Sequence, residues 1–182
     1  AAAAPLGWRP KALIVPHAGY VYSGPVAGGA FRQLASGCGE IDRVVLLGPS
    51  HFVPFAGLAL PVAEAFETPL GDVPVAADAA VHLASLPQVV LSDLPHEREH
   101  ALEVELPFLQ VALERFELVP LVVGDATPEE VAAVLDRLWG GEETLIVVST
   151  DLSHYLDSAT AAARDRATAD AIVALDVDGI AA

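Results

Sequence analysis

Four short apolar runs most constrain what this chain can fold into. They are rich in β-branched residues and almost continuously apolar, and they are ALIV (12–15), RVVLLG (43–48), FELVPLVVG (116–124) and TLIVVST (144–150). Runs of this kind are typical of parallel strands that are covered on both faces of a sheet. Helical patterns separate them. The sequence therefore predicts an α/β fold, a single three-layer domain with a mostly parallel central sheet and helices on both faces.

Three segments carry helical patterns, and they are 99–116, 127–141 and 159–175. In the first, leucines recur at spacings of four and three, and Pro107 should either kink the helix or mark its start. In the second, Thr127 suits the cap position and Gly140 suits the stop. The proline-rich stretch 57–75 contains a Pro-Leu-Gly turn and predicts an edge pair or a hairpin.

Composition narrows the classes of function. The chain has 182 residues, 53% of them hydrophobic, which fits one globular domain over residues 1–182. Its formal charge of −16 would repel phosphate backbones and anionic lipid, so we expect no nucleic-acid or membrane partner. The single cysteine, Cys38, cannot form an internal disulfide, and the N-terminus carries no secretory pattern, so we expect a cytoplasmic location.

Histidines follow three of the four predicted strands, namely His17, His51 and His154. Because the carboxyl ends of parallel strands meet at one edge of a sheet, these imidazoles can converge there. Two neutral imidazoles with a carboxylate or thiolate suit a divalent transition metal, and a histidine that is not a ligand can act as a general base. A lone histidine after a strand is more often a hydrogen-bonded loop residue. Three together favour a shared site, with His17 and His51 as metal ligands.

Polar residues near these histidines have two interpretations each. Asp151 could orient His154, which would then move protons or contact substrate, or it could simply cap the next turn. In the segment HEREHALEVELP, Glu99, His100 and Glu103 share one helical flank. They could support the metal histidines, or the acids could complement the helix dipole. We predict that His100 and Glu103 lie near the site.

Other residues flank the predicted site. Tyr20 and Tyr22 could form the wall of an aromatic pocket with polar tips, or they could be half-buried strand residues. Ser50 directly precedes His51, and we expect it in the pocket together with Tyr20. Cys38 has no histidine or acid at ligand spacing and is interpreted as structural or incidental.

The strand-end motifs resemble one known family. PHAGYVYSG, LGPSHFVP, FETPLGD, EHALEVELPFL, VPLVVG and STDLSHY occur here in the order and at roughly the spacing of the MEMO family. The resemblance covers residues 12–155 and is closest to the bacterial and archaeal members called AmmeMemoRadiSam system protein B. Those proteins resemble class III extradiol ring-cleavage dioxygenases in fold, so the resemblance implies an extradiol-dioxygenase-like domain.

The resemblance also implies roles for individual residues. His17 and His51 match the family's two metal-ligating histidines, with Fe(II) as the expected metal and copper as the alternative. His154 matches the acid–base histidine of the ring-cleaving relatives, and Asp151 matches the aspartate beside it. The positions that match the family's helix motif near the pocket are Glu99, His100 and Glu103.

One departure concerns the third ligand. In the family it is a cysteine in a C-terminal segment, where the dioxygenases have a glutamate, and Cys38 does not match it. We therefore expect the third ligand beyond Ala182, and a domain that is incomplete at its C-terminus.

Three functions remain open at this point. The first, which we predict, is a MEMO-type metal protein in metal or redox chemistry, with a protein partner such as a radical-SAM system. The second is an Fe(II)-dependent oxidoreductase that cleaves a catechol-like aromatic substrate with O₂. The third is a metal-dependent hydrolase in which the histidines and Asp151 activate water.

Overall fold

The computed structural model describes residues 6–36 and 40–181, so Cys38 lies outside the described residues. The chain divides into two compact units, Ala1–Thr150 and Asp151–Ala182. Within the described ranges, no helix combines the length and the apolar character that crossing a membrane would need.

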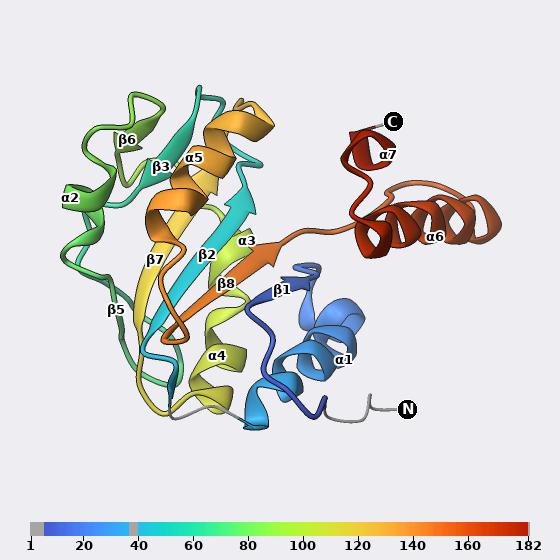
Figure 1. Ribbon diagram of the computed structural model, residues 1–182, viewed down its shortest axis with the longest axis horizontal. Helices are drawn as coiled ribbons and strands as arrows, with labels where there is room; N and C mark the ends of the chain where they lie inside the picture. The colour runs from blue at the N-terminus through green and yellow to red at the C-terminus, as the bar shows by residue number, and fades with distance from the viewer. Residues whose placement is uncertain (1–5, 37–39, 182) are drawn as a thin grey trace. The chain divides into compact units, whose positions relative to one another are not determined.

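The first unit is built on a six-stranded sheet with the strand order β1-β8-β2-β7-β3-β6 (Figure 1). These strands are β1 (Ala12–Val15), β2 (Arg43–Pro49), β3 (Leu58–Leu60), β6 (Val89–Leu91), β7 (Glu117–Val123) and β8 (Thr144–Ser149). Strands β1, β8, β2 and β7 are parallel neighbours, and they are the four runs identified in the sequence. Strand β3 is antiparallel to β7, and β6 is parallel to β3. The prediction of a mostly parallel sheet is confirmed.

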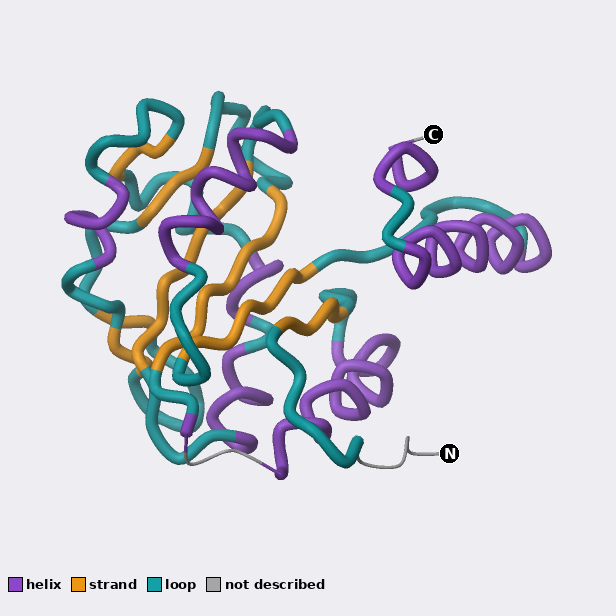
Figure 2. The backbone as a smooth tube through the Cα atoms, in the orientation of Figure 1, coloured by secondary structure: helices purple, strands orange, loops and turns teal. Residues whose placement is uncertain are grey.

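Helices cover both faces of this sheet, as Figures 1 and 2 show. The helices on one face are α1 (Tyr20–Phe31), η1 (Arg32–Ser36), α3 (His100–Glu103) and α4 (Leu106–Ala112), and those on the other are α2 (Ala79–Leu83) and α5 (Pro128–Leu138). Side chains of β2 alternate between two cores, with Leu46 in the first and Leu47 in the second. This alternation explains the continuous apolar run, since both faces of the strand are buried, and the three-layer prediction is confirmed.

Local end signals act as the sequence predicts. Thr127 and Glu130 form a capping box at the start of α5, each side chain accepting a hydrogen bond from the other residue's backbone N–H. The predicted helix over 99–116 is divided into α3 and α4, and Pro107 lies in the first turn of α4. The proline therefore starts a second helix, because its missing N–H costs nothing there. In the second unit, α6 (Ser158–Ala174) and α7 (Val177–Ala181) follow.

The stretch 57–75 is only partly a hairpin. Strands β4 (Ala65–Phe66) and β5 (Val73–Pro74) form the expected antiparallel pair. Strand β3, in contrast, lies inside the main sheet between β7 and β6. Its side chains are buried on both faces, with Ala59 in one core and Leu58 and Leu60 in the other.

Helix α1 replaces the loop or strand expected after His17. Ser23, Ala27 and Phe31 recur every four residues and are its buried side chains, whereas Tyr22 on the same helix is exposed. The glycines and the proline of this segment have poor helix propensity, so tertiary packing of the buried positions decides its structure.

We expect His96 to make the stability of the protein pH-dependent. Its Nε2–H donates to the Ala59 carbonyl over 3.1 Å, and its Nδ1 is buried with no hydrogen-bond partner among the described residues. Burial lowers the pKa of His96 below its ordinary value of 6.5, despite the opposing effect of that hydrogen bond. The unfolded chain therefore binds a proton at a higher pH than the folded chain, and the free energy of unfolding should fall as pH falls below 6.5.

Urea unfolding from about pH 8 to about pH 5 measures this effect. We expect the decline to be shallower in His96→Gln than in the unsubstituted protein. The matched control is His82→Gln, which removes one imidazole from an exposed position. Equal slopes for the unsubstituted protein and His96→Gln would contradict the assignment.

Candidate metal centre

The sheet topology brings two of the strand-end histidines together. Strand β8 lies between β1 and β2, and all three are parallel, so their carboxyl ends share one edge of the sheet. His17 follows β1, His51 follows β2, and Ser149 is the last residue of β8. Ser149 is the register partner of Val15. The imidazole rings of His17 and His51 consequently lie edge to face, with their centroids 5.3 Å apart.

A third histidine joins them from α3. His100 is the first residue of that helix, and its ring centroid is 5.2 Å from that of His51 and 5.9 Å from that of His17. Helix α3 reaches this position because Gly48 of β2 has no side chain. A Cβ there would lie 3.1 Å from the Cβ of Ala101 and closer still to Leu102. We refer to His17, His51 and His100 as the histidine cluster.

Glu99 links α3 to the loop after β2. Its buried carboxylate accepts hydrogen bonds from the backbone N–H of His51 (2.7 Å), from the His51 ring at Nδ1 (2.8 Å) and from the N–H of Ala101 (3.0 Å). The last of these caps α3. Burial opposes ionisation of Glu99, but the N–H donors outweigh it and hold the pKa below its ordinary value. Glu99 is therefore an ionised acceptor that fixes the orientation of His51.

His17 is held by a different residue. It is 3% exposed, and its Nδ1 lies 2.9 Å from the hydroxyl oxygen of Ser149. The Ser149 hydroxyl also lies 2.6 Å from the Ala101 carbonyl oxygen and 3.3 Å from Oε1 of Glu105. His17 and His51 thus both use Nδ1 for a hydrogen bond to a buried side chain.

Ser50, Tyr20 and Glu103 are the remaining predicted residues of this unit. Ser50 donates its hydroxyl hydrogen to the Val53 carbonyl over 2.7 Å, which supports the turn that carries His51. Tyr20 donates to the Val104 carbonyl at the end of α3 over 3.1 Å, and burial raises its pKa, with Glu105 and Glu103 adding to the effect. Glu103 itself is exposed.

Asp151 and His154 belong to the second unit. There, Nε2 of His154 lies 3.9 Å from a carboxylate oxygen of Asp151. Their predicted roles in proton transfer stay predictions.

Two neighbours of the cluster were missed by sequence reasoning, Ser149 and Phe52. The Phe52 ring is 49% exposed and lies 6.4 Å from the ring of His51 and 6.3 Å from that of His100. The Arg98 guanidinium carbon is 5.2 Å from the Phe52 centroid. Phe52 could have been found because it directly follows a predicted ligand. Ser149 has no such signal in the sequence, because its contact with His17 depends on β8 lying beside β1.

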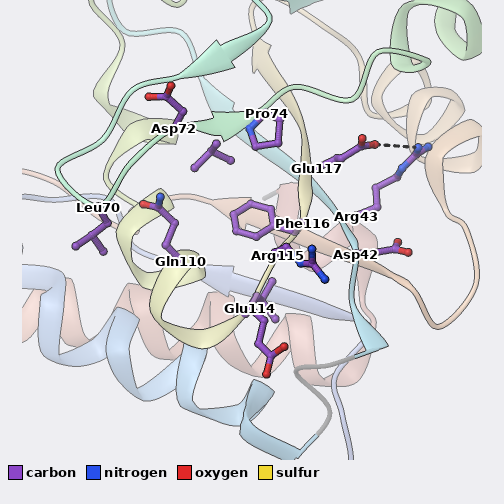
Figure 3. Close-up of a pocket in the computed structure, with 12 residues that line it drawn as sticks. Asp42, Arg43, Leu70, Asp72, Pro74, Gln110, Glu114, Arg115, Phe116 and Glu117 are labelled. Atoms are coloured by element: carbon purple, nitrogen blue, oxygen red, sulfur yellow. Dashed lines mark ion pairs between the residues drawn. The ribbon is translucent and has the colours of Figure 1, made fainter.

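A cavity of about 770 Å³ lies elsewhere (Figure 3). Its lining includes Arg43 and Glu117, which begin β2 and β7, together with Phe116 and Gln110. The histidine cluster follows the opposite ends of the parallel strands. Since none of the described lining residues is a histidine, this cavity is separate from the cluster.

The histidine cluster fits a transition metal. Imidazoles that bind the same ion have ring centroids about 4.5–5.5 Å apart, because each metal–nitrogen bond is about 2 Å long. The ring centroids of His17 and His51 are 5.3 Å apart. His51, Glu99 and His100 also offer ligand atoms that lie within 4.8 Å of one another. Metal-binding histidines usually use their second ring nitrogen for a hydrogen bond. His17 and His51 both make such a hydrogen bond through Nδ1.

The fold and these residues define a three-layer α/β protein with a histidine cluster at the carboxyl edge of its parallel strands. The chain belongs to the Memo-like protein family, whose model matches residues 4–182.

Curated relatives agree with this assignment. The chain is 41% identical over 173 residues to a MEMO1 family protein of Thermotoga neapolitana, and the alignment covers 90% of this chain and 61% of the relative. It is 35% identical over 171 residues to one of Nitrosopumilus maritimus, covering 91% and 62%. It is 37% identical over 180 residues to one of Aquifex aeolicus, covering 93% and 64%. The chain thus spans about three fifths of the length of these relatives.

Proposed function

We propose that this chain holds a non-haem metal ion between His17 and His51, and that the protein acts in metal or redox chemistry or together with a radical-SAM system. One observation carries the proposal. The two rings lie 5.3 Å apart at the ends of strands that flank β8, and each uses Nδ1 for a hydrogen bond to a buried side chain. The metal we propose is Fe(II), with copper as the alternative, because imidazole suits both.

The chain's own residues then have distinct tasks. His17 and His51 provide the metal-binding nitrogens, while Ser149 and Glu99 hold their rings in orientation. A bound iron or copper ion would supply one-electron redox chemistry. His100, whose side chain is 45% exposed, borders the site on the α3 side.

A specific observation favours a second candidate, the Fe(II)-dependent extradiol-type dioxygenase. The half-exposed ring of Phe52 stands beside His51 and His100, and it offers a flat apolar surface to a catechol-like aromatic ring.

Anaerobic titration of the protein with Fe(II), and separately with copper, tests the metal site. We expect near-stoichiometric binding that weakens by about 100-fold or more in a His17→Ala/His51→Ala double variant. His82→Ala, an exposed histidine on α2, is the matched control and should bind as the unsubstituted protein does. Equal binding by the protein and the double variant would refute the proposal.

Addition of catechols and O₂ to the Fe(II)-loaded protein then separates the two candidates. A ring-cleaved product that the double variant does not form would favour the dioxygenase. Metal binding without such a product would favour the metal or redox protein.

A further inference from the structure

We propose that Ser149 is a positioning residue that determines which nitrogen of His17 is available to a metal. The proposal rests on the metal site proposed above, but it begins with the hydrogen bonds of the metal-free protein. Ser149 is 1% exposed and lies at the meeting point of three elements. Its own strand is β8, its hydroxyl contacts the histidine that follows β1, and it contacts the backbone of α3.

The single hydroxyl hydrogen of Ser149 decides the arrangement. The Ala101 carbonyl oxygen, 2.6 Å away, can only accept a hydrogen bond, so the Ser149 hydroxyl must donate to it. The longer contact to Glu105, at 3.3 Å, competes for the same hydrogen and is the weaker acceptor by distance. With its hydrogen committed, the hydroxyl oxygen can serve His17 only as an acceptor. The 2.9 Å contact is therefore a hydrogen bond donated by Nδ1–H of His17.

This placement fixes the tautomer of His17. A neutral imidazole carries one hydrogen, and with that hydrogen on Nδ1 the lone pair lies on Nε2. Metal ions bind the nitrogen that carries the lone pair. Ser149 thereby selects Nε2 of His17 as the metal-binding atom.

His51 reaches the same tautomer by an independent route. Its Nδ1 lies 2.8 Å from Oε1 of Glu99, and both oxygens of that carboxylate already accept backbone N–H groups, from His51 and Ala101. Nδ1 is therefore the donor, and the lone pair of His51 is also on Nε2. A serine on β8 and a glutamate at the start of α3 thus impose one tautomer on two rings 5.3 Å apart. Two histidines with a purely structural role would not need the same tautomer. Two histidines that bind one ion each need a ring nitrogen whose lone pair is free to bind it.

The position of α3 is coupled to this arrangement. The acceptor of the Ser149 hydrogen is Ala101, which directly follows Glu99 and His100 in the chain. The same short segment therefore orients both rings, one through Glu99 and one through Ser149.

The experiment compares three variants of the protein. Ser149→Ala removes the acceptor for Nδ1–H, and Ser149→Thr keeps a hydroxyl at the same place. Thr144→Val removes a buried hydroxyl from the opposite end of β8, where it contacts Glu143 and not a histidine, so it is the matched control. The first readout is ¹⁵N NMR of the histidine rings in the metal-free protein. The second is the dissociation constant for Fe(II).

We expect the unsubstituted protein, Thr144→Val and Ser149→Thr to show His17 with its hydrogen on Nδ1. In Ser149→Ala we expect a mixture of tautomers and Fe(II) binding weaker by about 10–100-fold. A single Nδ1–H tautomer in Ser149→Ala, with unchanged Fe(II) binding, would overturn the proposal, even if that variant unfolds more easily.

The two readouts also separate this proposal from the metal site. If the unsubstituted protein binds no metal, the proposed function fails, and the tautomer of His17 still decides the role of Ser149. If Ser149→Thr does not fold, the comparison of Ser149→Ala with Thr144→Val decides it alone.

Discussion

Replacing Glu99 by alanine should lower the free energy of unfolding by about 2–4 kcal/mol and weaken Fe(II) binding by about 10–100-fold. The carboxylate satisfies three N–H groups, two on His51 and one on Ala101, and its side chain is almost fully buried. Without it, α3 loses its cap and the His51 ring loses the hydrogen bond that sets its orientation. Urea unfolding and metal titration measure the two effects separately.

Two further variants sharpen this result. Glu97→Ala removes an exposed acid two residues earlier and should change neither measurement appreciably. Glu99→Gln keeps the shape but replaces one acceptor oxygen with an amide donor, so we expect an intermediate loss in both measurements. If Glu99→Ala matched Glu97→Ala, Glu99 would have no part in holding His51.

The second large effect is expected at Gly57, where alanine should destabilise the fold by about 3 kcal/mol or more. Its φ angle is +83°, and a Cβ built there would overlap the backbone carbonyl oxygen of Gln88. The residue also joins β3 to the end of β7, since its N–H donates to Asp125 over 2.8 Å and its carbonyl accepts from Gly124 over 2.9 Å. The Gln88 carbonyl is held in place, because it also accepts a hydrogen bond from the N–H of Leu58 over 2.8 Å.

Gly71→Ala provides the matched control for Gly57→Ala. Its φ angle is +109°, but no atom lies within 4 Å of the position that a Cβ would take. This variant should show only the cost of the backbone conformation, about 1–2 kcal/mol. The difference between the two variants in urea unfolding therefore isolates the steric overlap. Equal losses would mean that the overlap at Gly57 is relieved by a small shift of the chain.

Much of the fold could be predicted because three of the four apolar runs, those of β2, β7 and β8, are buried on both faces, whereas β1 is buried on one face only. Leu46 and Leu47 are adjacent in sequence and pack into different cores, so the buried middle positions of β2 had to be apolar. Such runs have no polar face that could confuse the assignment. Helix α1 could not be predicted, because its glycines and proline argue against a helix and only packing of Ser23, Ala27 and Phe31 supports one.

The candidate site divides in the same way. His17 and His51 could be singled out because each follows a run that is clearly a strand. Ser149 could not, since nothing local distinguishes a serine at the end of a strand from a surface residue. Its importance depends on β8 lying between β1 and β2, although β8 comes about a hundred residues after β2 in the chain.

By itself, the sequence determined the α/β class, the parallel strands and the two histidines at their ends, because these depend on local patterns of apolar and polar residues. The tertiary structure decided which atoms of those histidines are available, because Ser149 and Glu99 come from β8 and from the start of α3. It also brought His100, which the sequence predicted near the site, into contact with both rings through the close approach of α3 to Gly48. These contacts join residues that are distant in the chain, and strand order and packing distance have no local signature in the sequence.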